Sequence, residues 1–406
     1  MRWVLRRGIF ASRRTHTYAD GLPRQMRHSI QRITDITELE RLAPEWDEID
    51  RLCSPRTPFS SPWWNLLWWR HFRENSLWIR DELFVLTVRD EHGRLLAVAP
   101  MMRSVRPAYG PLRIREIQFF GADTHIMEFR ELACRPEHRA TALQLIHAHF
   151  MQQSHEWDSV LWCGIPAGEC PEALGTQHLH RTVRDYYLQL PGCWQELVAG
   201  LSRNMKEALR KCYNSLRREG HTFTFRAVAL PAQVDAALEH FFALHRARAE
   251  LANTVAHPDR FGPERSRKFF REYAHHMAER DQLRIFQLEI GGRIVATRVA
   301  FLLGDEMYLY YSGYLPEWRR FSVMTTLTAE AIKWAIERRL RIVNLSTGSD
   351  YSKIRWRPSE AASSDYLVWS PTVRSRPVHG RLFDLLRHAV PHSMLGRAVS
   401  MVRRDQ

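Results

Sequence analysis

A short motif occurs twice in this chain, once in each half. Gly93-Arg94-Leu95-Leu96-Ala97 returns as Gly292-Arg293-Ile294-Val295-Ala296, an offset of 199 residues in a chain of 406. Each copy follows an alternating apolar run and a turn rich in polar or glycine residues, which is the pattern of a β-hairpin. A repeat at about half the chain length predicts that one fold is used twice, in tandem.

Both halves also share a predicted order of elements: a helix, antiparallel strands, a second helix and a last strand. The expected strands are 83–89, 95–101, 114–120 and 159–163 in the first half, and 283–289, 294–301, 307–314 and 342–346 in the second. Mixed sheets covered by helices accommodate this order. We therefore expect an α/β (α+β) fold of two domains, each a mixed, mainly antiparallel sheet packed by helices on both faces.

Proline and glycine residues punctuate the chain between residues 165 and 192, which predicts the boundary between the halves there. The expected organisation is a flexible basic arm over 1–28, an N-terminal domain over 29–190, a C-terminal domain over 191–370 and a basic amphipathic tail over 371–406.

Composition excludes some classes of protein and leaves several kinds of partner. Apolar residues make up 45% of the chain and aromatic residues 11%, which is far from the composition of disordered proteins. The net charge of +14 favours anionic partners such as nucleotide cofactors, RNA, acidic polysaccharides or lipid headgroups, without choosing among them.

The six cysteines are scattered along the chain, which favours reduced thiols in the cytoplasm over a disulfide framework. The spacing of Cys163, Cys170, His178 and His180 lacks the close cysteine pair of a structural zinc site, so we expect no metal. No apolar run is long enough to span a bilayer, and the first residues lack the apolar core of a signal peptide. We expect a cytoplasmic protein with at most peripheral contact to the inner membrane face.

An aromatic helix is predicted over 63–72, begun by Ser61 and Pro62. Trp64 and Trp68 fall on one of its faces. A tryptophan cluster could bind sugar rings, but aromatic residues at helical spacing are far more often part of a core, and we expect core packing here.

A second helix, between Ser202 and Gly220, carries an apolar stripe and beside it a basic band that includes Lys206, Arg210 and Arg217. Such a band is most often a solvated face. The alternative is that it guides an anionic substrate or the acceptor arm of a tRNA.

The strand 307–314 passes through a loop with Arg319 and Arg320 into a further helix. A strand that leads into a helix through a basic loop directs backbone N–H groups and the helix dipole at one point. This arrangement predicts a site for the phosphates of a donor molecule. Neither a Walker-type phosphate loop nor a Gly-x-Ser-x-Gly elbow is found, so hydrolase and NTPase functions are not favoured.

Several motifs between residues 33 and 369 match those of a known family. They are Phe59-Ser60-Ser61-Pro62-Trp63-Trp64, Val98-Ala99-Pro100, Leu201-Ser202-Arg203-Asn204-Met205-Lys206, Leu244-His245-Arg246-Ala247-Arg248, Tyr310-Tyr311-Ser312-Gly313-Tyr314, and Asp350-Tyr351-Ser352-Lys353 with Trp356. With these motifs the chain resembles the CelD/BioF-type acetyltransferases of the GNAT superfamily. These are relatives of the FemAB aminoacyl transferases and place two GNAT-like folds in tandem.

The resemblance implies that acetyl-CoA or another acyl-CoA donates its acyl group directly to an amine, without a covalent enzyme intermediate and without a metal. The implied cofactor-binding residues are Tyr311, Ser312, Gly313, Arg319, Arg320, Ser322, Val323 and Met324. The first three belong to the strand whose backbone N–H would polarise the thioester carbonyl, and the others would receive the pyrophosphate. The family usually has a Pro-Gly pair where this chain has Ser322-Val323-Met324.

For catalysis, the resemblance places Tyr351 where GNAT enzymes carry the tyrosine that protonates the departing CoA thiolate. A phenol is matched to that task, and a core tyrosine is the competing interpretation. Asp350 is the candidate that deprotonates the amine, and His245 is a further candidate base, although a single histidine on a helix is more often packing or surface. The expected substrate-binding residues are Asn204, Lys206, Arg210 and Lys353.

We therefore expect a cytoplasmic acyl-CoA-dependent N-acyltransferase, acting on an amine of a polysaccharide precursor or small molecule. The first alternative is a FemAB-like transferase that uses aminoacyl-tRNA, and the second is a non-catalytic GNAT-like scaffold for polysaccharide machinery or membrane. The basic tail could contact anionic lipid, or could simply pack on the enzyme.

Overall fold

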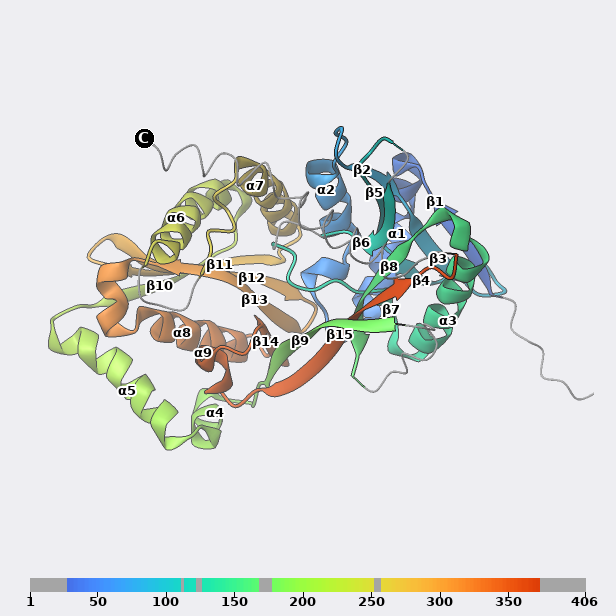
Figure 1. Cartoon of the computed structure of the whole chain (residues 1–406). Helices are drawn as coiled ribbons and strands as arrows, with labels where there is room; N and C mark the ends of the chain where they lie inside the picture. The colour runs from blue at the N-terminus through green and yellow to red at the C-terminus, as the bar shows by residue number, and fades with distance from the viewer. Residues whose placement is uncertain (1–27, 111–112, 122–125, 168–176, 252–256, 373–406) are drawn as a thin grey trace, which may run out of the picture.

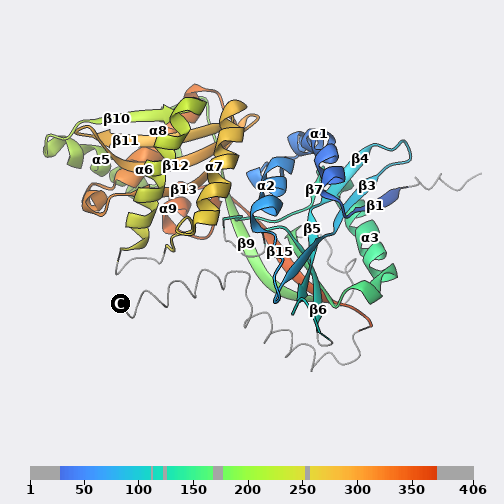
Figure 2. The same cartoon turned by 90° about the horizontal axis from the view of Figure 1, so that it is seen from above.

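The computed structural model of the protein describes residues 28–110, 113–121, 126–167, 177–251 and 257–372 (Figure 1). The predicted basic arm and basic tail, except residues 28, 371 and 372, lie outside these described residues. The described chain forms two lobes, one from each half of the sequence (Figures 1 and 2).

In the first half the helices are α1 (Ile36–Leu52), α2 (Pro62–Phe72) and α3 (Pro136–Gln152). The strands are β1 (Ser29–Ile33), β2 (Arg80–Leu83), β3 (Val85–Arg89), β4 (Leu95–Ala99), β5 (Met101–Arg106), β6 (Ile114–Phe119), β7 (Ala133–Cys134), β8 (Ser159–Pro166) and β9 (Gln177–Gln189).

In the second half the helices are α4 (Trp194–Gly200), α5 (Arg203–Arg218), α6 (Pro231–Ala249), α7 (Glu264–Glu279), α8 (Val323–Glu337) and α9 (Tyr351–Ile354). The strands are β10 (Phe223–Val228), β11 (Leu283–Ile290), β12 (Arg293–Leu303), β13 (Glu306–Tyr314), β14 (Ile342–Thr347) and β15 (Ser359–Trp369). A 3-10 helix, Pro316–Phe321, leads from β13 into α8.

Two sheets organise these strands. The smaller has the order β1-β3-β4-β7, and the larger has the order β10-β11-β12-β13-β14-β9-β15-β8-β6-β5-β2. The larger sheet passes without interruption from one lobe to the other (Figure 1). Its neighbours are antiparallel except for β13 with β14 and β6 with β8, which confirms the predicted mixed, mainly antiparallel class.

The two halves exchange their last strands. Although β9 ends the first half, it pairs with β14 of the second, and β15 pairs with both β9 and β8. Each lobe therefore depends on a strand supplied by the other half of the sequence. The division at residue 190 follows β9, and we propose it as the point where the chain passes from the first domain to the second.

The second predicted hairpin is confirmed, since β11 and β12 pair across Gly291 and Gly292, which both have positive φ. The first is confirmed in its centre, where β3 pairs with β4. Its outer residues differ from the prediction, because Leu83 and Met101 belong to β2 and β5 of the larger sheet. An alternating apolar run gives the spacing of a strand but not the sheet that it joins.

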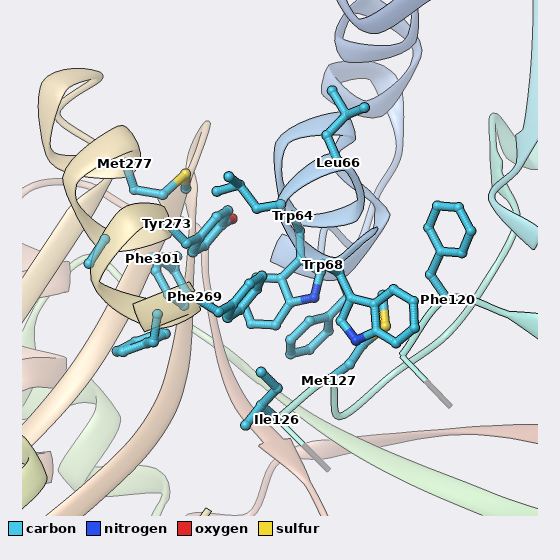
Figure 3. Close-up of a cluster of buried hydrophobic side chains, with 14 of the residues drawn as sticks. Trp64, Leu66, Trp68, Phe120, Ile126, Met127, Phe269, Tyr273, Met277 and Phe301 are labelled. Atoms are coloured by element: carbon cyan, nitrogen blue, oxygen red, sulfur yellow. The ribbon is translucent and has the colours of Figure 1, made fainter. Parts of the chain in front are cut away.

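The aromatic face of α2 is buried, as predicted for a core helix. The Trp64 and Trp68 side chains are 0% exposed. The Trp64 ring centroid lies 5.0 Å from that of Phe269 and 4.7 Å from that of Tyr273, both on α7 (Figure 3). Burying a side chain of this size contributes roughly 2–3 kcal/mol. The cluster therefore anchors helices of the two halves to each other.

Candidate active site

The site begins where two parallel strands separate. β13 and β14 pair only over three registered positions, from Glu306 opposite Ile342 to Tyr308 opposite Asn344. β13 continues to Tyr314 without β14 beside it, which leaves a gap in the sheet.

Near the end of β14, where it separates from β13, one residue has a left-handed backbone conformation. Ser346 has a φ of 72° and its N–H donates to the Asn344 side-chain oxygen at 2.7 Å. The Ser346 hydroxyl donates to Glu128 at 2.8 Å, and the Tyr308 hydroxyl donates to the same carboxyl oxygen at 2.6 Å. Because Glu128 comes from the first half, that half supplies a clamp for the strands of the site.

On the other side, β13 is held against α6. A Cβ added to Gly313 would lie 2.3 Å from the backbone N of His245, so only glycine permits this approach. The register of β12 and β13 also shifts between Arg298 and Ala300, so that Tyr310 and Tyr311 lie opposite a single residue. The bulge and the gap together shape the cavity beside β13.

A cavity of about 750 Å³ occupies this position. Its walls come from α6, β12, β13, the 3-10 helix, α8, β14 and α9. The residues that line it are Arg248, His257, Arg298, Ser312, Tyr314, Arg319, Ser322, Val323, Met324, Thr325, Thr328, Leu345, Tyr351, Ser352, Lys353, Arg355 and Trp356. Basic side chains are numerous and none of these described lining residues is acidic, so the cavity suits an anionic ligand.

Most of the predicted cofactor residues meet at this cavity. Ser312, Arg319, Ser322, Val323 and Met324 line it. The others differ from the expectation in orientation.

Tyr311 packs its ring on His245 and Phe261, away from the lining. Gly313 faces the backbone of α6. Arg320 donates to Glu219 at 2.7 Å, so of the two neighbouring arginines only Arg319 reaches the cavity.

The turn into α8 contains a residue with an uncommon backbone conformation. Ser322 adopts a φ of 55° and a ψ of 39°, a left-handed conformation that glycine enters at less cost. Its N–H donates to the Arg319 carbonyl at 3.0 Å and is therefore not free for a phosphate. In the described chain the N–H groups of Val323 and Met324, in the first turn of the helix, donate to no backbone acceptor.

Among the predicted catalytic residues, Tyr351 lines the cavity and is 71% exposed. Asp350 does not line it and instead lies 3.6 Å from the Lys353 ammonium. Lys353 lines the cavity, and its Nζ donates to the Thr347 carbonyl. Burial lowers the pKa of Lys353, while the Glu128 carboxylate acts in the opposite direction.

His245 is placed as a structural residue rather than a base. Its Nδ1 lies 3.1 Å from the Ser312 carbonyl, and its Nε2 accepts from the Arg260 N–H at 3.3 Å. Both ring nitrogens are thus occupied by backbone groups, and burial lowers the pKa of the imidazole. The side chain ties α6 to β13 and does not reach the cavity.

The predicted substrate residues of the basic helix lie apart from the cavity. Asn204, Lys206 and Arg210 belong to α5, and none of them lines it. The Lys206 ammonium donates to the Ala199 carbonyl at 2.9 Å, while Arg210 is exposed. The predicted apolar stripe of this helix is buried, as expected.

Several lining residues were not predicted as site residues, above all Arg248, His257, Arg298 and Arg355. Arg248 belongs to a motif that carries the family resemblance, but His245 was the residue predicted from that motif. Arg298 is a charged residue within the apolar strand β12, and that interruption was the available signal. His257 and Arg355 carry no comparable mark in the sequence.

The described residues also bear on metal binding and on membrane insertion. They contain no group of three or more histidine, cysteine, aspartate or glutamate side chains arranged to hold a metal ion. Within the same residues, no helix combines the length and apolarity needed to cross a membrane.

Comparison with known proteins identifies the second half. Residues 203–354 match the family described as acetyltransferase (GNAT) domain. This stretch is a GNAT domain. No curated protein sequence matches the chain. Because residues 203–354 match an acetyltransferase domain, the chain is an enzyme of the acyl-transferring type.

Solved structures resemble the whole tandem arrangement. FemX is 11% identical, with a TM-score of 0.51, over 83% of this chain and 96% of FemX. A tandem GNAT protein from the clavulanic acid biosynthesis pathway is 10% identical over 85% of this chain and 99% of that one, with a TM-score of 0.43. The FemX likeness confirms the tandem GNAT and FemAB-like fold.

Proposed function

We propose that the protein transfers an acyl group from acetyl-CoA or another acyl-CoA to an amine of a polysaccharide precursor or small molecule. The observation that carries this proposal is the basic cavity at the gap between β13 and β14, with the first turn of α8 in its wall. Arg319 and the N–H groups of Val323 and Met324 would hold the pyrophosphate. The part of β13 that has no β14 beside it would offer backbone N–H groups to the thioester carbonyl.

The reaction proceeds by direct attack. The amine nitrogen forms a bond to the thioester carbonyl carbon, and the carbon–sulfur bond breaks. Tyr351 gives its phenol proton to the departing thiolate. Asp350, which stands beside the cavity and not in its lining, takes a proton from the attacking amine through a water molecule. Lys353 contacts phosphate or an acidic substrate. We also propose a cytoplasmic location, with peripheral membrane contact through the tail that starts at residue 371.

Isothermal titration of acetyl-CoA and free CoA into the wild type, Arg319→Ala and Arg320→Ala tests the donor. Arg320 is a matched control, because it stands in the same turn but pairs with Glu219. We expect micromolar binding that Arg319→Ala weakens about tenfold or more, since it loses a charge-assisted phosphate contact, and that Arg320→Ala retains. Absence of binding to the folded wild type would contradict an acyl-CoA donor.

A second candidate is an aminoacyl-tRNA-dependent transferase, which two observations favour. Ser322 uses its N–H within the chain, which reduces the donors for pyrophosphate. The basic side chains Arg210, Lys211, Arg217 and Arg218 of α5 are exposed. Under this candidate, RNA binding falls steeply with salt while CoA does not bind. If neither ligand binds, a non-catalytic scaffold for polysaccharide machinery or membrane is the remaining candidate.

A further inference from the structure

Two arginines from different elements converge on one hydroxyl inside the cavity. Arg248, near the end of α6, donates from Nη1 to the Ser312 hydroxyl oxygen at 3.0 Å. Arg298, in β12, approaches the same oxygen with Nη2 at 3.4 Å. All three residues line the cavity. The two guanidinium groups are thereby held close together on one wall.

The described part of the chain offers neither guanidinium a carboxylate partner. Their side-chain partners among the described residues are Ser312 and His257, and no carboxylate oxygen there lies within 4.0 Å of a side-chain nitrogen of either arginine. The Nε of Arg298 is buried and has no hydrogen-bond partner in that same part of the chain. Arg248 instead places Nη2 2.7 Å from the His257 imidazole. Burial, and then the neighbouring charge of Arg248, lower the pKa of Arg298 to about 10.

This arrangement differs from the way in which the chain buries arginine elsewhere. The Arg56 side chain is only 9% exposed, and Asp50 lies 2.8 Å from its Nη2. Two like charges at low dielectric cost free energy unless an opposite charge joins them. Within the described residues, Glu128 attracts Arg298 and Asp350 attracts Arg248 only from beyond ion-pair distance. The positions against both guanidinium groups are therefore left to an oxyanion that arrives with a ligand.

The side chains of Arg248, Arg298 and Ser312 indicate which negatively charged groups could bind between them. Guanidinium forks bind carboxylate and phosphate oxygens with paired hydrogen bonds, and the Ser312 hydroxyl between them can donate a further one. The donor phosphates have their own place under the proposed function, at Arg319 and the first turn of α8. Arg248 and Arg298 belong instead to α6 and β12.

We propose that the acceptor carries an oxyanion, a carboxylate or a phosphate, that binds between Arg248 and Arg298 at Ser312. This subsite rests on the proposed acyltransferase function. It implies that the enzyme selects an amine that bears a negative charge, such as an amino acid or a phosphorylated amino sugar, over its neutral counterpart.

Binding of inorganic phosphate to the full chain tests the subsite without knowledge of the acceptor. The variants are Arg298→Met and Arg248→Met, which keep an apolar stem, and Arg293→Met is the control in the same strand as Arg298. Arg293 is exposed and pairs with Glu317. We expect phosphate to raise the melting temperature of the wild type and of Arg293→Met. The rise should be largely lost in both cavity variants, and in the wild type it should persist when CoA is saturating.

Transfer to matched amines then distinguishes carboxylate from phosphate. Each pair has an anionic and a neutral member: an amino acid with its amide, and glucosamine 6-phosphate with glucosamine. For the pair whose anion fits, we expect the wild type to favour the anionic member by about tenfold or more in kcat/KM, and Arg298→Met to reduce that ratio towards one.

The outcomes separate the two proposals. If CoA abolishes the phosphate effect, the oxyanion belongs to the donor and the acceptor assignment is overturned. If CoA binds but phosphate has no effect and no pair is discriminated, the subsite is wrong while the proposed function stands. If CoA fails to bind and no transfer occurs, the proposed function is wrong, and the acceptor assignment that rests on it is overturned too.

Discussion

The two halves use the same strand, helix, strand unit, and among the residues that the structure describes the basic cavity belongs to the second half. In the first half β6 and β8 are parallel over three registered positions, from Glu116 opposite Ser159 to Gln118 opposite Leu161, with α3 between them in sequence. In the second half β13 and β14 are parallel over three positions as well, with α8 between them. The topology is therefore shared, and the difference lies elsewhere.

The difference lies in the connection from strand to helix. Six residues of 3-10 helix lead from β13 towards α8, whose first turn has no acidic residue. In the first half the chain between β6 and α3 includes β7, and Glu137 in the first turn of α3 pairs with Arg135. A carboxylate there disfavours an anionic ligand. The fold supplies the gap, and the connection decides whether it can receive phosphates.

The first half has instead become support for the second. Ile126 accepts a hydrogen bond from Tyr310, and Glu128 accepts from Tyr308 and Ser346. Both acceptors stand in the long connection that follows β6. The same unit thus serves as ligand site in one half and as clamp in the other.

The largest effect is expected where β13 meets α6, because this approach has no tolerance for a side chain. Gly313→Ala would place a methyl group 2.3 Å from backbone atoms of α6. We expect a loss of about 3 kcal/mol in the free energy of unfolding, measured by urea denaturation. Gly192→Ala is the matched control, since no atom lies within 4 Å of its Cβ position, and its effect should stay within about 0.5 kcal/mol. Equal losses would show that the approach is not rigid.

Giving α8 the acidic first turn of α3 sharpens the comparison. Met324 occupies the second helical position, as Glu137 does in α3. If the turn holds donor phosphates, Met324→Glu should weaken CoA binding by about tenfold or more, because the carboxylate repels them. Met324→Gln has the same shape without the charge and should bind within about threefold of the wild type. An equal loss in both variants would mean that shape rather than charge matters.

Removing the clamp tests the supporting role of the first half. Glu128→Ala leaves the Tyr308 and Ser346 hydroxyls without their acceptor, which should cost about 2 kcal/mol in stability. The double variant with Tyr308→Phe should lose less than the sum of the single changes. Urea denaturation of all four proteins measures this coupling. Strict additivity would exclude the clamp.

Local parts of this architecture could be read from the sequence. Glycines 291 and 292 between alternating apolar runs predicted the second hairpin, and Ser202 predicted the start of α5, because turn and cap chemistry act over a few residues. Arg319 was predicted from its place in the loop after the strand 307–314, and Tyr351 from the family resemblance at the end of the strand 342–346. Both line the cavity.

Long-range features could not be read in the same way. Arg248 and Arg298 are 50 positions apart and meet only because β12, β13 and α6 pack together. The exchange of β9 and β15 was not predicted either, because an apolar alternation does not name the neighbouring strand. His245 was selected as a base by residue type, whereas its hydrogen bonds to backbone groups are set by the tertiary fold.

A second cavity differs from the basic cavity in the charge of its lining. It has a volume of about 170 Å³ and is lined by Glu131 and Asp185 among others. Burial raises the pKa of Glu131 to about 7. The protonated carboxyl therefore stabilises the fold below pH 4.5, and this contribution is lost as the pH rises through about 7.

Glu131→Gln should remove this dependence. As the pH rises from 5 to 8, the free energy of unfolding of the variant should increase by roughly 2 kcal/mol relative to that of the wild type. Denaturation at several pH values measures the difference. Parallel curves for the two proteins would show that this carboxyl ionises as it does in water.

The smallest expected effect concerns the turn that distinguishes the two halves. Ser322 pays for a left-handed conformation that costs a residue with a Cβ roughly 1–2 kcal/mol, while glycine loses about 0.5–1 kcal/mol of entropy on folding. Ser322→Gly should therefore raise stability by about 0.5 kcal/mol, as measured by urea denaturation. If acyl-CoA is the donor, the variant should also bind CoA at least as tightly as the wild type, because removing the side chain opens the approach to the first turn of α8. Weaker binding would mean that the serine hydroxyl itself holds the ligand, and the loop would then be a site built around serine rather than one that lacks its glycine.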